Sequence, residues 1–177
     1  MSLDYDIHVS WELKAVFLCK KYESDGPEEA MLKILILEWE VNGEPASKFG
    51  KQEEDALRTL TQHRCSSTPH FIAAKREIQD GNMLMPGGYI HYILMTKVDG
   101  VRFDSVQHFS DEQIHAMQEA FTEAWFESSA CQVVPHDERL HNLLWDMGTL
   151  KCCKVMISYR TYSLIHNSVV LLTCGSV

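Results

Sequence analysis

The sequence predicts an α+β fold in which a small antiparallel sheet and one helix precede the start of a mostly helical lobe. Three observations support this prediction. Residues 9–18 and 30–41 have the apolar patterns of strands, residues 47–63 are rich in helix formers, and residues 110–129 carry apolar side chains at helical spacing. Strands therefore come first along the chain, and the longest helix follows them.

The first elements each have a recognisable signal. In residues 9–18 every second side chain is apolar, which predicts one buried face made by Val9, Trp11, Leu13, Ala15 and Phe17. A Ser-Asp-Gly-Pro turn precedes the next strand, whose apolar run at residues 31–37 is interrupted only by Lys33. In the helix at residues 47–63, a buried stripe is expected at Ala56, Leu57 and Leu60.

The later elements follow a short apolar stretch at residues 69–75. Residues 89–98 form the best strand of the sequence, and the Asp-Gly pair that follows closes it. Ser110 and Gln113 have the spacing of a capping box, which predicts the start of the long helix. Its buried side is expected at Ile114, Met117, Phe121, Ala124 and Trp125.

Charge and composition exclude several classes of protein. The 16 Lys and Arg against 25 Asp and Glu give a net charge of −9, which argues against a nucleic-acid partner. No run approaches the ~18 apolar residues of a membrane span, and residues 1–20 lack a signal-peptide pattern. The six cysteines are therefore expected as reduced thiols in the cytoplasm. Cys152 and Cys153 are interpreted as strand residues rather than a redox or metal pair.

Lys33 is the first residue with a chemical implication. A lysine inside an apolar strand is costly to bury unless it has an acidic partner or an anionic ligand. Glu53 and Glu54 on the following helix can supply the carboxylate. The alternatives are an edge-strand lysine that extends its amine to water, and a solvated helix face for both glutamates.

The segment from Asp137 to Asn142 is the second such feature. An Asp and an Asn five residues apart, flanked by apolar strands, are what a phosphotransferase catalytic loop uses. There the Asp accepts the proton of the substrate hydroxyl, and the Asn oxygen holds magnesium. A weaker alternative site is zinc bound by His63, Cys65 and His70, for which a helix end followed by a loop is the simpler interpretation.

With these residues, the sequence resembles the protein-kinase-like superfamily from about residue 9 to residue 154. The likeness is nearest to the aminoglycoside and choline phosphotransferase branch and to kinase-like proteins abundant in fungi. It implies ATP and Mg²⁺ as cofactors, with Lys33 as the phosphate-binding lysine and Glu53, three residues before Ala56, as its helix partner in preference to Glu54.

The same resemblance assigns the remaining site residues. Met95, Lys97 and Val98 would provide the hinge backbone that binds adenine. Asp137 would act as the catalytic base, Arg139 would lie near the transferred phosphate, and Asn142 would bind magnesium. The implied domains are a kinase-like N-lobe at residues 1–98, a partial C-lobe at 99–154 and a divergent tail at 155–177.

Three departures from the family pattern stand out, and the last of them, a missing magnesium-binding carboxylate, predicts little or no turnover. His136 stands directly before Asp137, Gly26 is the only glycine before Lys33, and no Asp or Glu follows Asp146. The family's second magnesium-binding aspartate would fall near residues 155–157.

The tail carries a single Lys, Arg, Asp or Glu, Arg160, which suggests translated non-family sequence; a divergent strand and helix is the alternative. The chain is thus expected to be a phosphotransferase fold for an unidentified hydroxyl acceptor, inactive or weakly active. The alternatives are a non-catalytic pseudokinase or interaction module with a protein partner, and a truncated gene product.

Overall fold

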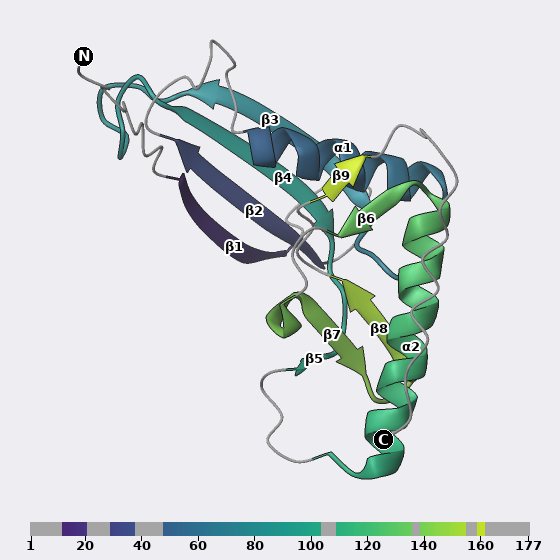
Figure 1. The fold of residues 1–177 in the computed structure, drawn as a ribbon. Coiled ribbons are helices and arrows are strands. Elements are labelled where there is room, and N and C mark those ends of the chain that lie inside the picture. The colour runs from purple at the N-terminus through teal and green to yellow at the C-terminus, as the bar shows by residue number, and fades with distance from the viewer. Residues whose placement is uncertain are drawn as a thin grey trace, which may run out of the picture.

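The computed structural model describes residues 12–20, 29–37, 48–103, 109–135, 139–154 and 159–161. Figure 1 shows two parts: a four-stranded sheet with one helix, and a smaller sheet packed on a long helix. The elements are β1 (Glu12–Lys20), β2 (Glu29–Leu37), α1 (Lys48–Gln62), β3 (Phe71–Ile78), β4 (Tyr89–Thr96), β5 (Val101–Arg102), α2 (Asp111–Ala130), β6 (Val133–Pro135), the 3₁₀ turn η2 (Leu140–Asn142), β7 (Leu143–Asp146), β8 (Lys151–Lys154) and β9 (Tyr159–Thr161). This is the α+β arrangement that the sequence predicts.

The four-stranded sheet is antiparallel, with strand order β1-β2-β4-β3. Its register places Lys33 opposite Ile93, Leu35 opposite His91, and Arg76 opposite His91. Because side chains alternate across a strand, all of these residues lie on the same face. That face is covered by α1, so three charged or polar side chains come to lie beneath one helix.

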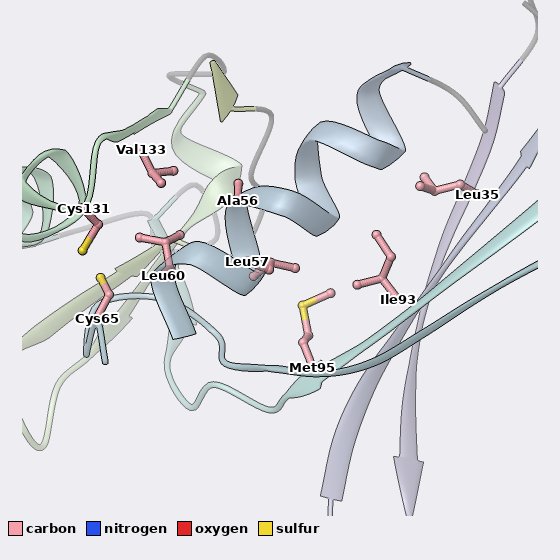
Figure 2. Close-up of a cluster of buried hydrophobic side chains, with 9 residues drawn as sticks. All are labelled: Leu35, Ala56, Leu57, Leu60, Cys65, Ile93, Met95, Cys131 and Val133. Atoms are coloured by element: carbon pink, nitrogen blue, oxygen red, sulfur yellow. The ribbon is translucent and has the colours of Figure 1, made fainter. Parts of the chain in front are cut away.

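The main core lies between this face and α1. Figure 2 shows Leu57 of the helix beside Met95 and Ile93 of β4, with Leu35 of β2 close by. Cys65, Cys131 and Val133 continue the cluster toward α2 and β6, and the two sulfur atoms face each other. The first sheet and the long helix therefore share one hydrophobic core.

The expected buried face of the first strand is wrong in the described part of β1. Leu13 and Phe17 are 49% and 50% exposed. Both lie on the sheet face opposite α1, whereas Val16 and Leu18 lie on the helix side and are also half exposed. Apolar side chains do alternate along β1, but α1 covers the sheet face opposite to the one that Leu13 and Phe17 occupy. Trp11 and Val9 lie outside the described residues.

A second core joins α2 to the β7–β8 hairpin. Ser110 and Gln113 form the predicted capping box, which starts α2 at Asp111. Trp145 packs among Met117, Ala124 and Cys152, and Phe103 meets its ring edge-on at 6.4 Å. Within the described residues, no helix is long and apolar enough to span a membrane.

Gly100 connects the two parts and has a backbone conformation that favours glycine, with φ of 134°. A Cβ at this position would lie 2.9 Å from the Trp145 carbonyl oxygen. The connection therefore needs glycine both for its backbone conformation and for its close approach to β7.

Of the expected tail at residues 155–177, the structure describes only β9. It pairs with β6, with Val134 opposite Arg160, and it contacts α1.

Candidate active site

Lys33 forms an ion pair with Glu53 between β2 and α1. Lys33 is 3% exposed and Glu53 is 5% exposed, so the pair is buried. Lys33 does not extend its amine to water, which excludes the edge-strand alternative. A buried charge of this kind needs its partner in place, and the pair therefore connects α1 to the middle of the sheet.

Apolar side chains adjoin the lysine on the same sheet face. Val16 of β1 lies opposite Lys33, and Leu18 lies opposite Met31. Val16 and Leu18 are half exposed, and Met31 is partly buried against the core. This face thus offers a buried cation next to accessible apolar surface, which is the combination needed to bind a phosphorylated aromatic ligand.

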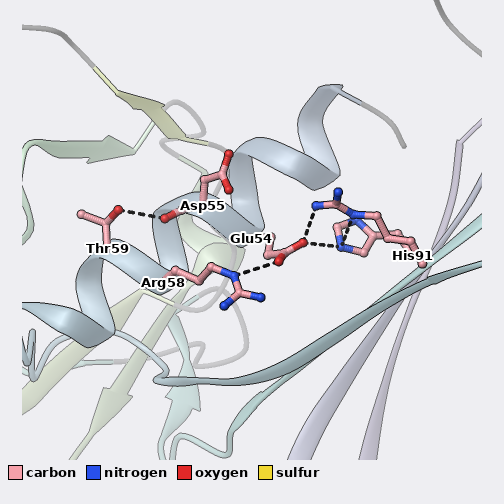
Figure 3. Close-up of polar contacts among 6 residues, drawn as sticks. Glu54, Asp55, Arg58, Thr59 and His91 are labelled. Carbon is pink, nitrogen blue, oxygen red and sulfur yellow. Dashed lines mark hydrogen bonds and ion pairs between the residues drawn. The ribbon is translucent and has the colours of Figure 1, made fainter. Parts of the chain in front are cut away.

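Glu54, the neighbour of Glu53, has its own set of partners (Figure 3). Its Oε1 accepts a hydrogen bond from Arg58 Nε at 2.8 Å, and its Oε2 interacts with Arg76 Nη2 and lies 2.9 Å from His91 Nε2. Burial raises the pKa of Glu54, but the hydrogen bonds from Arg58 and Arg76 outweigh burial and lower it overall. Glu54 therefore remains an anion beneath the helix.

His91 is fully buried, and its two contacts determine which ring nitrogen carries the proton. Nε2 lies 2.9 Å from Glu54 Oε2 and 3.5 Å from Arg76 Nε. The shorter contact requires Nε2 to donate to the carboxylate, so the longer one is not a hydrogen bond. Burial lowers the pKa of His91, and the positive charge of Arg76 lowers it further. His91 is therefore neutral near pH 7.

This environment predicts that the protein loses stability as the pH falls below the ordinary His pKa of 6.5. Because the folded state holds the His91 pKa lower, the unfolded chain binds more protons in that range, and protonation favours unfolding. Between pH 7.5 and 5.5 we expect the melting temperature to fall. His91→Gln, which keeps an N–H donor but does not titrate, should flatten this dependence. Equal pH slopes for the two proteins would contradict the assignment.

The expected hinge residues lie at the end of β4. Met95 belongs to the strand itself, where it pairs with Met31 and Phe71, and its side chain lies in the main core. The strand ends at Thr96, two residues earlier than the sequence predicts. Lys97 is held by Glu29 at 2.8 Å and Asp99 at 3.1 Å. The connecting backbone therefore starts at Lys97 and Val98.

The catalytic-loop-like segment is described in part. Asp137 lies outside the described residues. Arg139 is exposed and precedes η2, where its carbonyl oxygen accepts a hydrogen bond from Asn142 N at 3.0 Å. Asn142 is buried at the start of the hairpin. The structure thus places Arg139 and Asn142 on one short turn, with the apolar strand β7 directly after it.

Asp146 lies at the end of β7, and its carboxylate is used by the hairpin turn. It accepts hydrogen bonds from Thr149 Oγ1 at 2.6 Å and from Gly148 N at 2.9 Å. The bond from Thr149 is the largest cause of its lowered pKa, followed by the bond from Gly148. In the described part of this segment Asn142 is the one expected magnesium ligand, so the donor set for magnesium is not met there.

The other metal and redox alternatives are not supported. His70 Nε2 lies 3.1 Å from the carbonyl oxygen of Cys65, and α1 ends just before His63. Among the described residues no three His, Cys, Asp or Glu side chains gather to hold a metal ion. Cys152 and Cys153 are buried strand residues of β8 and form no disulfide, in line with the strand interpretation.

The sequence analysis did not single out three polar side chains that take part in the contacts of this region. Arg76 and His91 bind Glu54, and Glu127 of α2 accepts hydrogen bonds from Ser66 and Ser67, including one from Ser67 N at 3.0 Å. Glu127 connects the long helix to the loop after α1. A histidine in the middle of the best strand was the only signal available for this group.

Comparison with known proteins supports the fold. The chain is similar to the structure of the Cydia pomonella granulovirus kinase PK-1, with a TM-score of 0.53 and 20% sequence identity. The match covers 82% of this chain and 48% of that one, so the chain spans about half the length of that kinase. No family model and no curated protein matches the sequence. The fold is therefore protein-kinase-like: a sheet-and-helix N-lobe with part of a helical lobe.

Proposed function

We propose that the chain is a kinase-like domain that binds ATP beside Lys33 and Glu53 and transfers phosphate weakly or not at all. The observation that carries this proposal is the buried ion pair between β2 and α1. In kinases a strand lysine held by a helix glutamate contacts the nucleotide phosphates. The adjacent apolar surface of Val16 and Leu18 suits the adenine ring.

The remaining site roles belong to the same proposal. Lys97 and Val98 would offer backbone groups to adenine, with Met95 behind them. Asp137 would be the base, and Arg139 would lie near the phosphate. Asn142 is the side chain that would hold magnesium, and bound magnesium would neutralise phosphate charge.

Two observations favour the non-catalytic alternative, a pseudokinase or interaction module. Asp146 is occupied by the hairpin turn, and residues 155–157 are Val, Met and Ile where a second magnesium carboxylate would be needed. The aminoglycoside and choline phosphotransferase branch, a fungal origin, the hydroxyl acceptor and a cytoplasmic location are further proposals from the sequence. The neighbour's name adds only that it is a kinase.

A thermal-shift titration with ATP tests the nucleotide site. At 100 times its Kd, a ligand stabilises the folded state by about 2.7 kcal/mol, which should raise the melting temperature by roughly 5–11 °C at about 2–4 °C per kcal/mol. The same ATP should not shift the double variant Lys33→Met, Glu53→Leu, which removes both charges of the buried pair. Lys75→Met removes an exposed lysine that pairs with Glu77, and should respond like the unmodified chain.

Magnesium separates the two versions of the proposal. A shift that requires Mg²⁺ supports a phosphotransfer site, and an equal shift without Mg²⁺ supports a non-catalytic nucleotide-binding module. No shift in the unmodified chain, or the same shift in the double variant, contradicts nucleotide binding beside Lys33.

A further inference from the structure

We propose that Arg76 and His91 are positioning residues that determine which of two adjacent glutamates pairs with Lys33. By holding Glu54 against β3 and β4, they leave Glu53 as the partner of the lysine. This role rests on the proposed function only in making Lys33 the nucleotide-binding residue; the selection itself concerns the packing of α1.

The geometry creates a real competition between the two carboxylates. Consecutive residues of a helix point about 100° apart, yet Glu53 and Glu54 are both buried beneath α1. Lys33 on β2 and His91 on β4 lie on the same sheet face, two residue positions apart in the register. A rotation of α1 about its axis would bring Glu54 toward Lys33 and move Glu53 away.

The donors around Glu54 decide between these two settings. Glu54 receives two guanidinium groups and one imidazole N–H, from Arg58, Arg76 and His91. Arg58 lies on α1 and turns with the helix, so within the described part of the chain it is Arg76 and His91 that tie Glu54 to the sheet. Charge-assisted hydrogen bonds are roughly twice as strong as neutral ones. The single ammonium of Lys33 would give Glu54 fewer such bonds than its present partners do. Glu54 therefore makes its strongest hydrogen bonds in its present position, and Glu53 is the carboxylate that remains to pair with Lys33.

The burial of His91 supports this selection. Its Nε2 proton is used on Glu54, and its buried Nδ1 has no hydrogen-bond partner within the described part of the chain. Among the described residues, the ring's shortest polar contact is the one to Glu54, so the imidazole is placed for that carboxylate. The neighbouring cation Arg76 lies directly across the strand pair and reaches the same oxygen.

Acetylation of Lys33 by N-hydroxysuccinimidyl acetate, followed by mass spectrometry, measures the pairing without any nucleotide. Lys33 is protected by burial and by Glu53. In Arg76→Met we expect Lys33 to react about tenfold faster, because α1 would then turn, separate Lys33 from Glu53 and expose the amine. A tenfold change corresponds to the loss of one charge-assisted hydrogen bond. Lys75→Met is the matched control, since it removes a cation from the next position on the other sheet face and should leave the rate unchanged.

The decisive variant combines Arg76→Met with Glu54→Gln. If Glu54 competes for Lys33 once Arg76 is gone, removing its charge ends the competition, and the labelling rate should return toward that of the unmodified chain. A rate as fast as or faster than in Arg76→Met alone would mean that Arg76 only stabilises the fold, and would overturn the proposal. So would unchanged labelling in Arg76→Met.

Substitutions at His91 test the same idea if Arg76→Met does not fold. His91→Phe removes the donor and should speed Lys33 labelling, whereas His91→Gln keeps an N–H for Glu54 and should restore slow labelling. Equal rates in these two variants would overturn the proposal. Failure of the unmodified chain to bind ATP would count against the proposed function alone, since the labelling requires no nucleotide.

Discussion

Replacing Glu53 by leucine is expected to lower the free energy of unfolding by about 3–5 kcal/mol, the usual cost of breaking a buried ion pair. The reason is that Lys33 stays buried beneath α1 with its main counter-charge removed. Adding Lys33→Met should recover most of this loss, because replacing a whole buried pair by apolar residues of similar volume is often neutral or stabilising. Urea unfolding curves with unchanged m-values would measure both effects.

An exposed glutamate provides the control for this experiment. Glu119 of α2 is exposed and faces His115 one helical turn away. Glu119→Leu should change stability by no more than about 0.5 kcal/mol. If Glu53→Leu costs as little as this control, Lys33 is not held by Glu53. If the double variant is as unstable as Glu53→Leu, the apolar side chains do not fit the space beneath α1.

The contact between β2 and α1 could be predicted because burying a charged lysine without a partner costs free energy in any protein. A lysine within an apolar strand needs a carboxylate, and the next helix carries two. The preference for Glu53 over Glu54 came from the resemblance to kinases, in which the position three residues before Ala56 is that of the paired glutamate. The structure supplies a physical reason, since Glu54 already has Arg76 and His91 as partners.

The partners of Glu54 could not be predicted because they depend on strand register. Arg76 stands in a Lys-Arg-Glu run that resembles a solvated strand end, and the short apolar stretch before it suggested an end near residue 75. The strand continues to Ile78, which places Arg76 on the helix side between the outward-facing Lys75 and Glu77. The prediction of the buried face of β1 was wrong for a related reason, since the alternation of apolar residues does not show which face of the sheet a helix covers.

Replacing Trp145 by alanine is expected to cost about 3–5 kcal/mol, the range for removing a large buried aromatic side chain. Trp145 is 1% exposed and fills the space between the β7–β8 hairpin and α2, where it packs on Met117 and Ala124. Its edge-on contact with Phe103 adds to the loss.

Phe126 is the matched control for Trp145, because it is an aromatic residue of α2 that is 68% exposed. Phe126→Ala should change the free energy of unfolding by about 0.5 kcal/mol or less. Hydrogen exchange then locates the damage. In Trp145→Ala the amides of α2 and β8 should lose protection before those of β2 and β4, because the first sheet keeps its own core with α1. Equal loss across both sheets would contradict a separate second core and would mean that the shared cluster around Cys65 and Cys131 makes the whole molecule unfold as one unit.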